Sequence, residues 1–126
     1  MKFQPETAEG VNLINRQEPT RVWVGGTAFG HSVLVPWVGD VQAWPVATLA
    51  DLTEQHFQQI LALQPELVIL GSGPRMRFVS SALLRALIER RIGVETMDTP
   101  AACRTYNVLV SEGRAVVAAL LLEAVA

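Results

Sequence analysis

The sequence predicts an α/β fold in which an N-terminal antiparallel β-meander precedes a βαβαβ unit. Before about residue 47, short stretches rich in Val and Trp alternate with glycines, a pattern typical of antiparallel strands. After that point, helical periodicity alternates with continuous apolar runs, which favours parallel strands buried on both faces. The length of 126 residues suits one compact domain, so we expect 1–126 to form a single unit, with residues 1–10 loosely ordered.

The meander is predicted from four stretches, VNLINR, TRVWVGG, HSVLVPW and VQAWPV, which glycines punctuate. An antiparallel sheet needs one buried face, so alternate side chains should point inward. On this basis the inward-facing residues are Val22, Val24, Val33 and Val35.

Two tryptophans, Trp37 and Trp44, flank the turn at Gly39-Asp40 of the meander. Exposed side chains at these positions would form an apolar patch for a protein partner. Paired tryptophans in a meander are more often part of the core, because an indole ring buries a large apolar area. The sequence leaves both assignments open.

The first helix is predicted to begin after a Thr53 cap and to end before Pro65, with Phe57, Ile60 and Leu61 on one face. The apolar run ELVIL follows and ends in GSG. Its continuous apolar character predicts a strand that is buried on both faces, as in a parallel sheet.

A second helix and strand are predicted from the segment that follows. The strand corresponds to IGVETM, and the helix before it should begin at a Ser80 or Ser81 cap. The inner face of that helix should carry Leu83, Leu84, Leu87 and Ile88.

The third helix is predicted from its end signals. Asp98 or Thr99 is the expected N-cap, Pro100 takes the first helical position, and Gly113 ends the helix. The last apolar run, AVVAALLL, is compatible with helix or strand. Because it is short and follows a glycine stop, we assign it to a third parallel strand, which completes βαβαβ with right-handed crossovers.

A candidate ligand site lies where these parallel strands end, because ligands of parallel sheets sit outside the carboxyl ends of the strands. The helix after Asp98 would also aim free N–H groups at this edge, which suits a small anion or a carboxylate. We call this the rim site. Its candidate residues are Gly71, Ser72, Gly73, Arg75, Asp98, Thr99, Cys103 and Arg104.

The glycines and caps of the rim site have structural alternatives. Gly71 and Gly73 can serve a tight turn, and the dinucleotide-binding motif is incomplete because Met76 stands at its third glycine. Asp98 and Thr99 are residues that helix N-caps prefer on structural grounds, so capping is their default role.

Cys103 is the one candidate nucleophile of the rim site. It lies near a helix N-terminus and beside Arg104, both of which could lower the pKa of its thiol. Cysteine is also among the most buried residue types, and we favour inert packing. No catalytic residue is therefore assigned. Arg75 and Arg104 could hold an anionic ligand or remain surface residues.

Composition excludes several classes of function. A formal net charge of −2 offers no electrostatic footprint for nucleic acid or an anionic membrane, and no apolar run is long enough for membrane insertion. The single cysteine excludes an internal disulfide, and together with two isolated histidines it predicts no metal site. We expect no cofactor and a cytoplasmic protein.

The stretches LGSGPRMRF, IGVETMDTPAACRTYN and EGRAVVAALL resemble the signature of a small α/β domain family of unknown function. That family includes a mitochondrial assembly factor for respiratory complex I and an adipogenesis-associated cytosolic protein. The resemblance implies a three-layer domain with a mixed central sheet, no established catalytic activity and, for the mitochondrial member, a protein-binding role. The chain departs from the pattern at Arg91, where a helix-ending glycine is usual, and its first residues, MKFQPETAEG, do not have the character of a transit peptide.

Two functional hypotheses follow. The first is a non-enzymatic binding module that captures a protein partner. The second is a small-molecule or anion-binding enzyme or sensor that uses the rim site, with Cys103 as thiolate and Arg75 or Arg104 as anion clamp. The reactivity of Cys103 distinguishes them, since a packed thiol resists alkylation and a thiolate does not.

Overall fold

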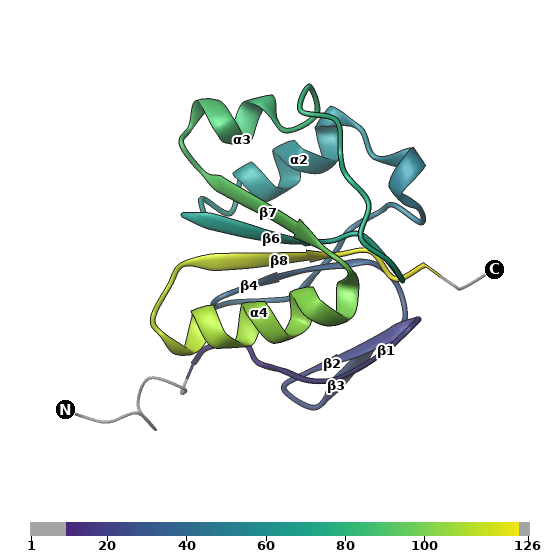
Figure 1. Ribbon diagram of the computed structural model, residues 1–126. Helices are drawn as coiled ribbons and strands as arrows, with labels where there is room; N and C mark the ends of the chain where they lie inside the picture. The colour runs from purple at the N-terminus through teal and green to yellow at the C-terminus, as the bar shows by residue number, and fades with distance from the viewer. Residues whose placement is uncertain (1–9, 124–126) are drawn as a thin grey trace.

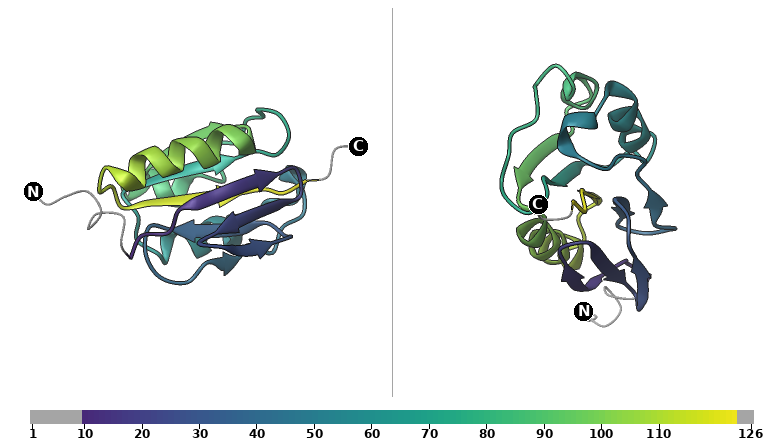
Figure 2. Two further views of the ribbon diagram at one scale, coloured as in Figure 1. Left: turned by 90° about the horizontal axis from the view of Figure 1, so that it is seen from below. Right: turned by 90° about the vertical axis from the view of Figure 1, so that its right-hand side faces the viewer.

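Three layers make up residues 10–123, the part of the chain that the computed structural model describes (Figure 1). A five-stranded sheet forms the middle layer, and two helices, α2 and α3, cover one of its faces. Helix α4 and a three-stranded antiparallel sheet lie side by side on the other face (Figure 2). The prediction of a mixed α/β fold is confirmed. The predicted loose order of residues 1–10 lies, except at Gly10, outside the described residues.

The strands of the outer sheet are β1 (Ile14–Glu18), β2 (Arg21–Val24) and β3 (Thr27–Phe29). The strands of the central sheet are β4 (Val33–Pro36), β5 (Gln42–Ala43), β6 (Leu67–Gly71), β7 (Gly93–Met97) and β8 (Val116–Leu120). The helices are the short 3-10 helix η1 (Leu49–Asp51), α2 (Glu54–Leu61), α3 (Arg85–Glu89) and α4 (Thr99–Ser111).

The central sheet has the strand order β5-β4-β8-β6-β7. Strands β6, β7 and β8 run parallel in one sheet, as predicted. Strand β6 lies between the other two, so the connection through α4 passes from β7 across β6 to β8. Strand β8 lies at the centre and also pairs antiparallel with β4, which makes the sheet mixed. All five residues of β8 are buried, so this strand carries apolar residues towards both faces.

The predicted meander is divided between the two sheets. Strands β1, β2 and β3 form a separate antiparallel sheet, whereas β4 and β5 belong to the central sheet. The prediction of one continuous meander was therefore wrong in its extent. The cause is that β4 is buried along its whole length and pairs over all four of its residues with β8, near the other end of the chain.

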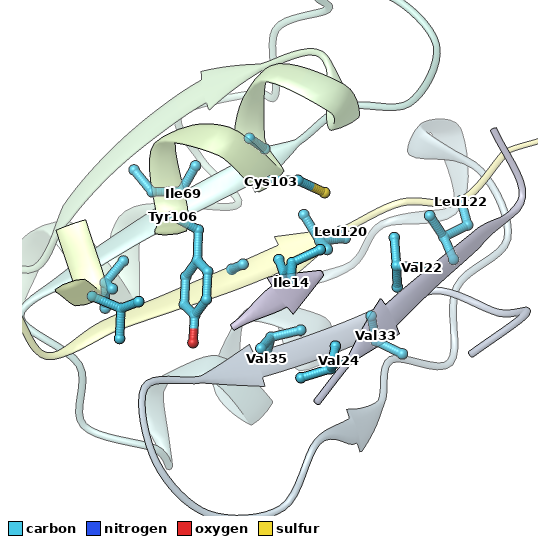
Figure 3. Close-up of a cluster of buried hydrophobic side chains, with 14 residues drawn as sticks. Ile14, Val22, Val24, Val33, Val35, Ile69, Cys103, Tyr106, Leu120 and Leu122 are labelled. Atoms are coloured by element: carbon cyan, nitrogen blue, oxygen red, sulfur yellow. The ribbon is translucent and has the colours of Figure 1, made fainter. Parts of the chain in front are cut away.

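The core has two parts, one on each face of the central sheet. Figure 3 shows the part that α4 and the outer sheet cover, in which the alternate valines of β2 and β4 converge. The four valines predicted to point inward are all buried in this cluster, which confirms the expected alternation: Val22, Val24, Val33 and Val35.

Helix α3 is shorter than the sequence pattern suggested. Residues 80–84 form turns, because Leu83 N–H and Leu84 N–H donate to carbonyls three residues back, and the α-helix begins at Arg85. In a helix of five residues only Leu87 is buried, and Ile88 is exposed. The predicted inner face was therefore wrong at Ile88.

The end of α3 explains the unusual Arg91. Its φ of 60° lies in the left-handed region, and Ile92 N–H donates to Leu87 O at 2.9 Å while Arg91 N–H donates to Ile88 O at 2.9 Å. These two bonds form the helix-ending motif that normally uses glycine at this position. The helix therefore ends where a glycine would be expected, on a residue whose Cβ makes the conformation costly.

We expect Arg91→Gly to stabilise the protein by about 0.5–1 kcal/mol, because glycine adopts the left-handed conformation without the Cβ penalty but loses more backbone entropy on folding. Chemical denaturation of the variant measures this change. Arg91→Ala is the matched control: it removes the same charge and keeps the Cβ, so it should bring no such gain. Equal effects of the two substitutions would attribute the change to charge instead.

Candidate functional site

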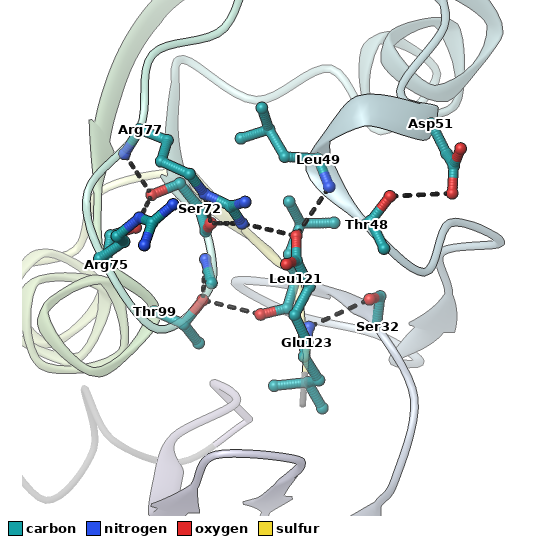
Figure 4. Close-up of polar contacts among 12 residues, drawn as sticks. Ser32, Thr48, Leu49, Asp51, Ser72, Arg75, Arg77, Thr99, Leu121 and Glu123 are labelled. Atoms are coloured by element: carbon teal, nitrogen blue, oxygen red, sulfur yellow. Dashed lines mark hydrogen bonds and ion pairs between the residues drawn. The ribbon is translucent and has the colours of Figure 1, made fainter. Parts of the chain in front are cut away.

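The rim site is organised around Thr99, the first residue of α4. Its backbone N–H donates to Gly73 O at 2.8 Å, and its Oγ1 accepts from Gly73 N–H at 2.9 Å. The same hydroxyl donates to Leu121 O at 2.8 Å, just beyond β8 (Figure 4). One buried side chain therefore joins the ends of β6 and β8 to the start of α4. The sequence suggested Thr99 as a cap and did not show this bridge.

Glycine is needed at two positions of the rim site, Gly71 and Gly73, for different structural reasons. A Cβ added at Gly71 would lie 2.8 Å from Thr99 Oγ1 and 3.0 Å from Thr99 Cα, so glycine permits the close approach of α4 to β6. Gly73 has a φ of 102°, a conformation that other residues rarely adopt. Both positions serve the junction that Thr99 holds.

A surface pocket of about 350 Å³ opens beside this junction. Its walls come from the turn between β1 and β2, from the segment after β6 and from the first turn of α4. The lining residues are Gln17, Glu18, Pro19, Gly73, Pro74, Thr99 and Pro100. A pocket does lie next to the predicted rim. Its three prolines add apolar surface without a backbone N–H donor, and Gln17 and Glu18 add polar side chains.

The N–H groups in the first turn of α4 already have partners. Thr99 N–H donates to Gly73 O, Pro100 has no N–H, and Ala101 N–H donates to Asp98 Oδ1 at 2.8 Å. Ala102 N–H donates to Asp98 O at 2.9 Å, so Asp98 is the helix cap. The helix therefore does not aim free N–H groups at the pocket, which removes the reason for expecting an anion there.

Cys103 lies in the core one turn further along α4, and its side chain points between the helix and the central sheet (Figure 3). It is 2% exposed and does not line the pocket. Burial raises the pKa of the thiol from 9.0 to about 12, although the charge of Arg104 acts in the opposite direction. The thiol is therefore neutral near pH 7 and stays in the apolar packing.

The two candidate anion clamps do not line the pocket. The side chains of Arg75 and Arg104 are exposed, on the loop after β6 and on α4 respectively. Ser72, which is buried, places its Oγ 2.8 Å from Arg75 O and 3.1 Å from Met97 O. Ser72 thus shapes the loop and is not available to a ligand.

The sequence analysis missed an ion pair that fixes this loop. Arg77 Nη2 lies 2.6 Å from Glu123 Oε2, and Arg77 also donates to Ser72 O at 2.6 Å (Figure 4). Glu123 Oε2 in turn accepts from Leu49 N–H at 2.7 Å. The two ion-pair side chains are 27% and 13% exposed. No local pattern could have paired residues 46 positions apart.

The two tryptophans of the predicted partner patch have different surroundings. Trp44 is 1% exposed, donates from Nε1 to His56 O at 3.1 Å and meets the ring of Phe57 edge to face. Trp37 is partly buried and packs against both parts of the core. The proposed partner patch was therefore wrong for Trp44, because a meander tryptophan here fills the space beneath α2.

Two further residues of α4, Tyr106 and Asn107, connect the helix to the segment around β1 and to β4. Tyr106 Oη donates to Asn12 O at 2.8 Å and lies 3.1 Å from Pro36 O. The Asn107 amide donates to Ile14 O at 2.8 Å and accepts from Ile14 N–H at 2.9 Å, as a neighbouring strand would. The stretch MDTPAACRTYN therefore joins α4 to both sheets.

Two further features concern the side chains and helices of the described residues. Among residues 10–123, no three His, Cys, Asp or Glu side chains gather in a way that could hold a metal ion. Within the same range, none of the helices combines the length and the apolar character needed to cross a membrane.

Comparison with known proteins connects this arrangement to a family. Residues 14–121 match the family described as "Protein of unknown function (DUF498/DUF598)". The chain is 35% identical over 124 residues to NADH dehydrogenase (ubiquinone) 1 alpha subcomplex assembly factor 3 of Bos taurus, covering 88% of this chain and 66% of that protein. It is 39% identical over 121 residues to the protein of the same name from Homo sapiens, covering 94% of this chain and 65% of the relative.

The fold is shared with solved structures. A protein of Bordetella parapertussis superimposes with a TM-score of 0.86 at 38% identity, covering 91% of this chain and 98% of the other. The chain spans slightly less than two thirds of the assembly factors and nearly the whole of the bacterial protein. The family match extends from β1 to the end of β8 and includes every element that forms the rim. The chain therefore belongs to the DUF498/DUF598 family of proteins of unknown function.

Proposed function

We propose that this protein is a non-enzymatic binding module that holds a protein partner, in the manner of the assembly factors to which it is similar. The observation that carries the proposal is that the polar residues of the stretch MDTPAACRTYN form hydrogen bonds within the domain. Asp98, Thr99, Tyr106 and Asn107 each place a polar side-chain atom in a hydrogen bond within the domain. Such residues build a scaffold and do not face a substrate.

The environment of Cys103 supports the same proposal. A nucleophilic cysteine needs access to its substrate and a thiolate at working pH. Here the thiol is buried, and burial raises its pKa to about 12. The names of the assembly-factor relatives indicate that those proteins take part in the assembly of a larger complex.

The reactivity of Cys103 tests the proposal. We expect iodoacetamide to modify the native protein slowly at pH 7.5 and rapidly in denaturant, because only unfolding exposes the thiol. The folded pKa exceeds the unfolded value of 9.0, so the contribution of this thiol to stability is complete below pH about 9 and decreases as pH rises towards 12. Cys103→Ala should remove this part of the alkaline destabilisation, measured by denaturation at pH 8 and pH 11.

A second experiment tests function. The wild type and Cys103→Ser are each purified from native cells, and the proteins and small molecules that they retain are compared by mass spectrometry. We expect both to retain the same protein partner. Two results together would reject the binding module in favour of an enzyme. The native thiol would have to be alkylated rapidly, and a folded Cys103→Ser variant that still binds its partner would have to lose function.

A further inference from the structure

The loop after β6 displays apolar side chains although its backbone is held in place. Phe78 is 81% exposed and Met76 is 43% exposed. Two residues fix this loop. Arg77, which lies between Met76 and Phe78, forms the ion pair with Glu123. Ser72 Oγ, which precedes them, contacts Arg77 N–H and Arg75 O (Figure 4). A phenyl ring on a fixed loop gains nothing from the core and is already positioned for contact with another molecule.

The loop also adjoins the proline-lined pocket. Pro74 and Gly73 are pocket walls, together with Pro19 and Pro100. Phe78 follows Pro74 by four residues, so their Cα atoms lie at most about 14 Å apart along an extended chain. A partner segment that spans about 14 Å therefore reaches from the pocket wall at Pro74 to the backbone of Phe78.

The charge of the loop indicates the chemistry of that segment. Arg75 is exposed and forms no ion pair with any of residues 10–123. From Gly73 to Ser81 the chain contains no acidic residue, and the carboxylate of Glu18 in the pocket wall is paired with Arg16 at 2.6 Å. Arginine, methionine and aromatic residues are the types enriched at protein interfaces, where an arginine pairs with a carboxylate of the partner.

We propose that Arg75, Met76, Phe78 and the pocket walls Pro19, Pro74 and Pro100 form the docking surface for the partner protein. We call it the Phe78 surface. Its occupant is an acidic segment of a different protein that places a large apolar side chain in the proline-lined pocket and a carboxylate on Arg75. This inference rests on the proposed function and names the surface and the partner chemistry.

Site-specific crosslinking tests the proposal. The full chain, with the photoreactive residue benzoylphenylalanine in place of Phe78, is irradiated in native cells, and the crosslinked peptide is mapped. The matched control carries the same residue in place of Val108, which is exposed on α4. We expect a crosslink to one segment of another protein from position 78, with carboxylates near the linked residue, and none to that segment from position 108.

The mapped segment, made as a peptide, is then titrated against the purified protein. Phe78→Ala should weaken binding roughly 30-fold, as a hot spot of about 2 kcal/mol does, while Val108→Ala should leave it unchanged. Arg75→Glu should weaken binding further at low salt than at high salt, because the lost contact is electrostatic. Thermal unfolding verifies that all three variants remain folded.

Three outcomes would overturn the inference: crosslinks only to a second copy of the chain, crosslinks only to lipid, or equal crosslinking from positions 78 and 108. Retention of a protein partner in the purification experiment, combined with any of these, would leave the binding module in place and reject only the Phe78 surface. Absence of a protein partner in both experiments would reject the proposed function itself.

Discussion

Replacing Trp44 by alanine is expected to destabilise the protein by about 3–5 kcal/mol, the loss that follows deletion of a large buried aromatic side chain. Trp44 is among the largest fully buried side chains and packs in the cluster beneath α2. The substitution also leaves His56 O without the donor at 3.1 Å. A loss of this size is a large share of the stability of an ordinary domain, so urea denaturation should show a much lower midpoint.

Trp44→Phe provides the matched control. It keeps an aromatic ring next to Phe57 and removes only part of the buried area and the hydrogen bond to His56 O. We expect a smaller loss than for alanine. Wild-type stability of Trp44→Ala, accompanied by weaker partner binding, would contradict the buried position and restore the patch that the sequence suggested.

Thr99→Val is expected to destabilise the protein by about 2–6 kcal/mol, because it leaves two buried groups without partners at about 1–3 kcal/mol each. Those groups are Gly73 N–H, which donates to Thr99 Oγ1, and Leu121 O, which accepts from it. Valine has nearly the shape of threonine, so the effect isolates the hydroxyl. Equilibrium denaturation with circular dichroism measures the change.

Thr99→Ser keeps the hydroxyl and removes one methyl group, so we expect a loss of only about 0.8 kcal/mol. The two variants together separate the bridge from simple packing. Comparable losses for Val and Ser would show that the hydrogen bonds to Gly73 and Leu121 contribute little. Hydrogen exchange at the Gly73 amide gives a second measurement, since this N–H should lose protection in Thr99→Val alone.

The local elements were predictable because their signals lie within a few residues of each other. Thr53 precedes α2, Asp98 caps α4, and Gly113 ends it with Arg114 N–H bound to Leu109 O. The continuous apolar runs identified the parallel strands for a similar reason, since burial on both faces excludes polar alternation. At the serines before α3 the cap signal was misleading, because turns follow them and the α-helix begins only at Arg85.

The site was predictable only as a region. The rule that ligands lie at the carboxyl ends of parallel strands brought Gly71, Gly73 and Thr99 together correctly. It did not indicate that the hydroxyl of Thr99 would form hydrogen bonds with Gly73 and Leu121, or that Arg77 would form an ion pair with Glu123. These contacts join residues 22 to 46 positions apart, and their partners exist only after the strands are ordered.

By itself, the sequence determined the types of element, most of their ends and the faces that carry valine, because caps, turns and hydrophobic alternation act over one or two turns of chain. Only the tertiary structure decided that β4 pairs with β8, that Trp44 is buried and that Phe78 remains outside. Burial is a property of the assembled layers. An aromatic residue in a turn and one in a loop are similar in sequence, and only the position of α2 over the sheet covers one of them.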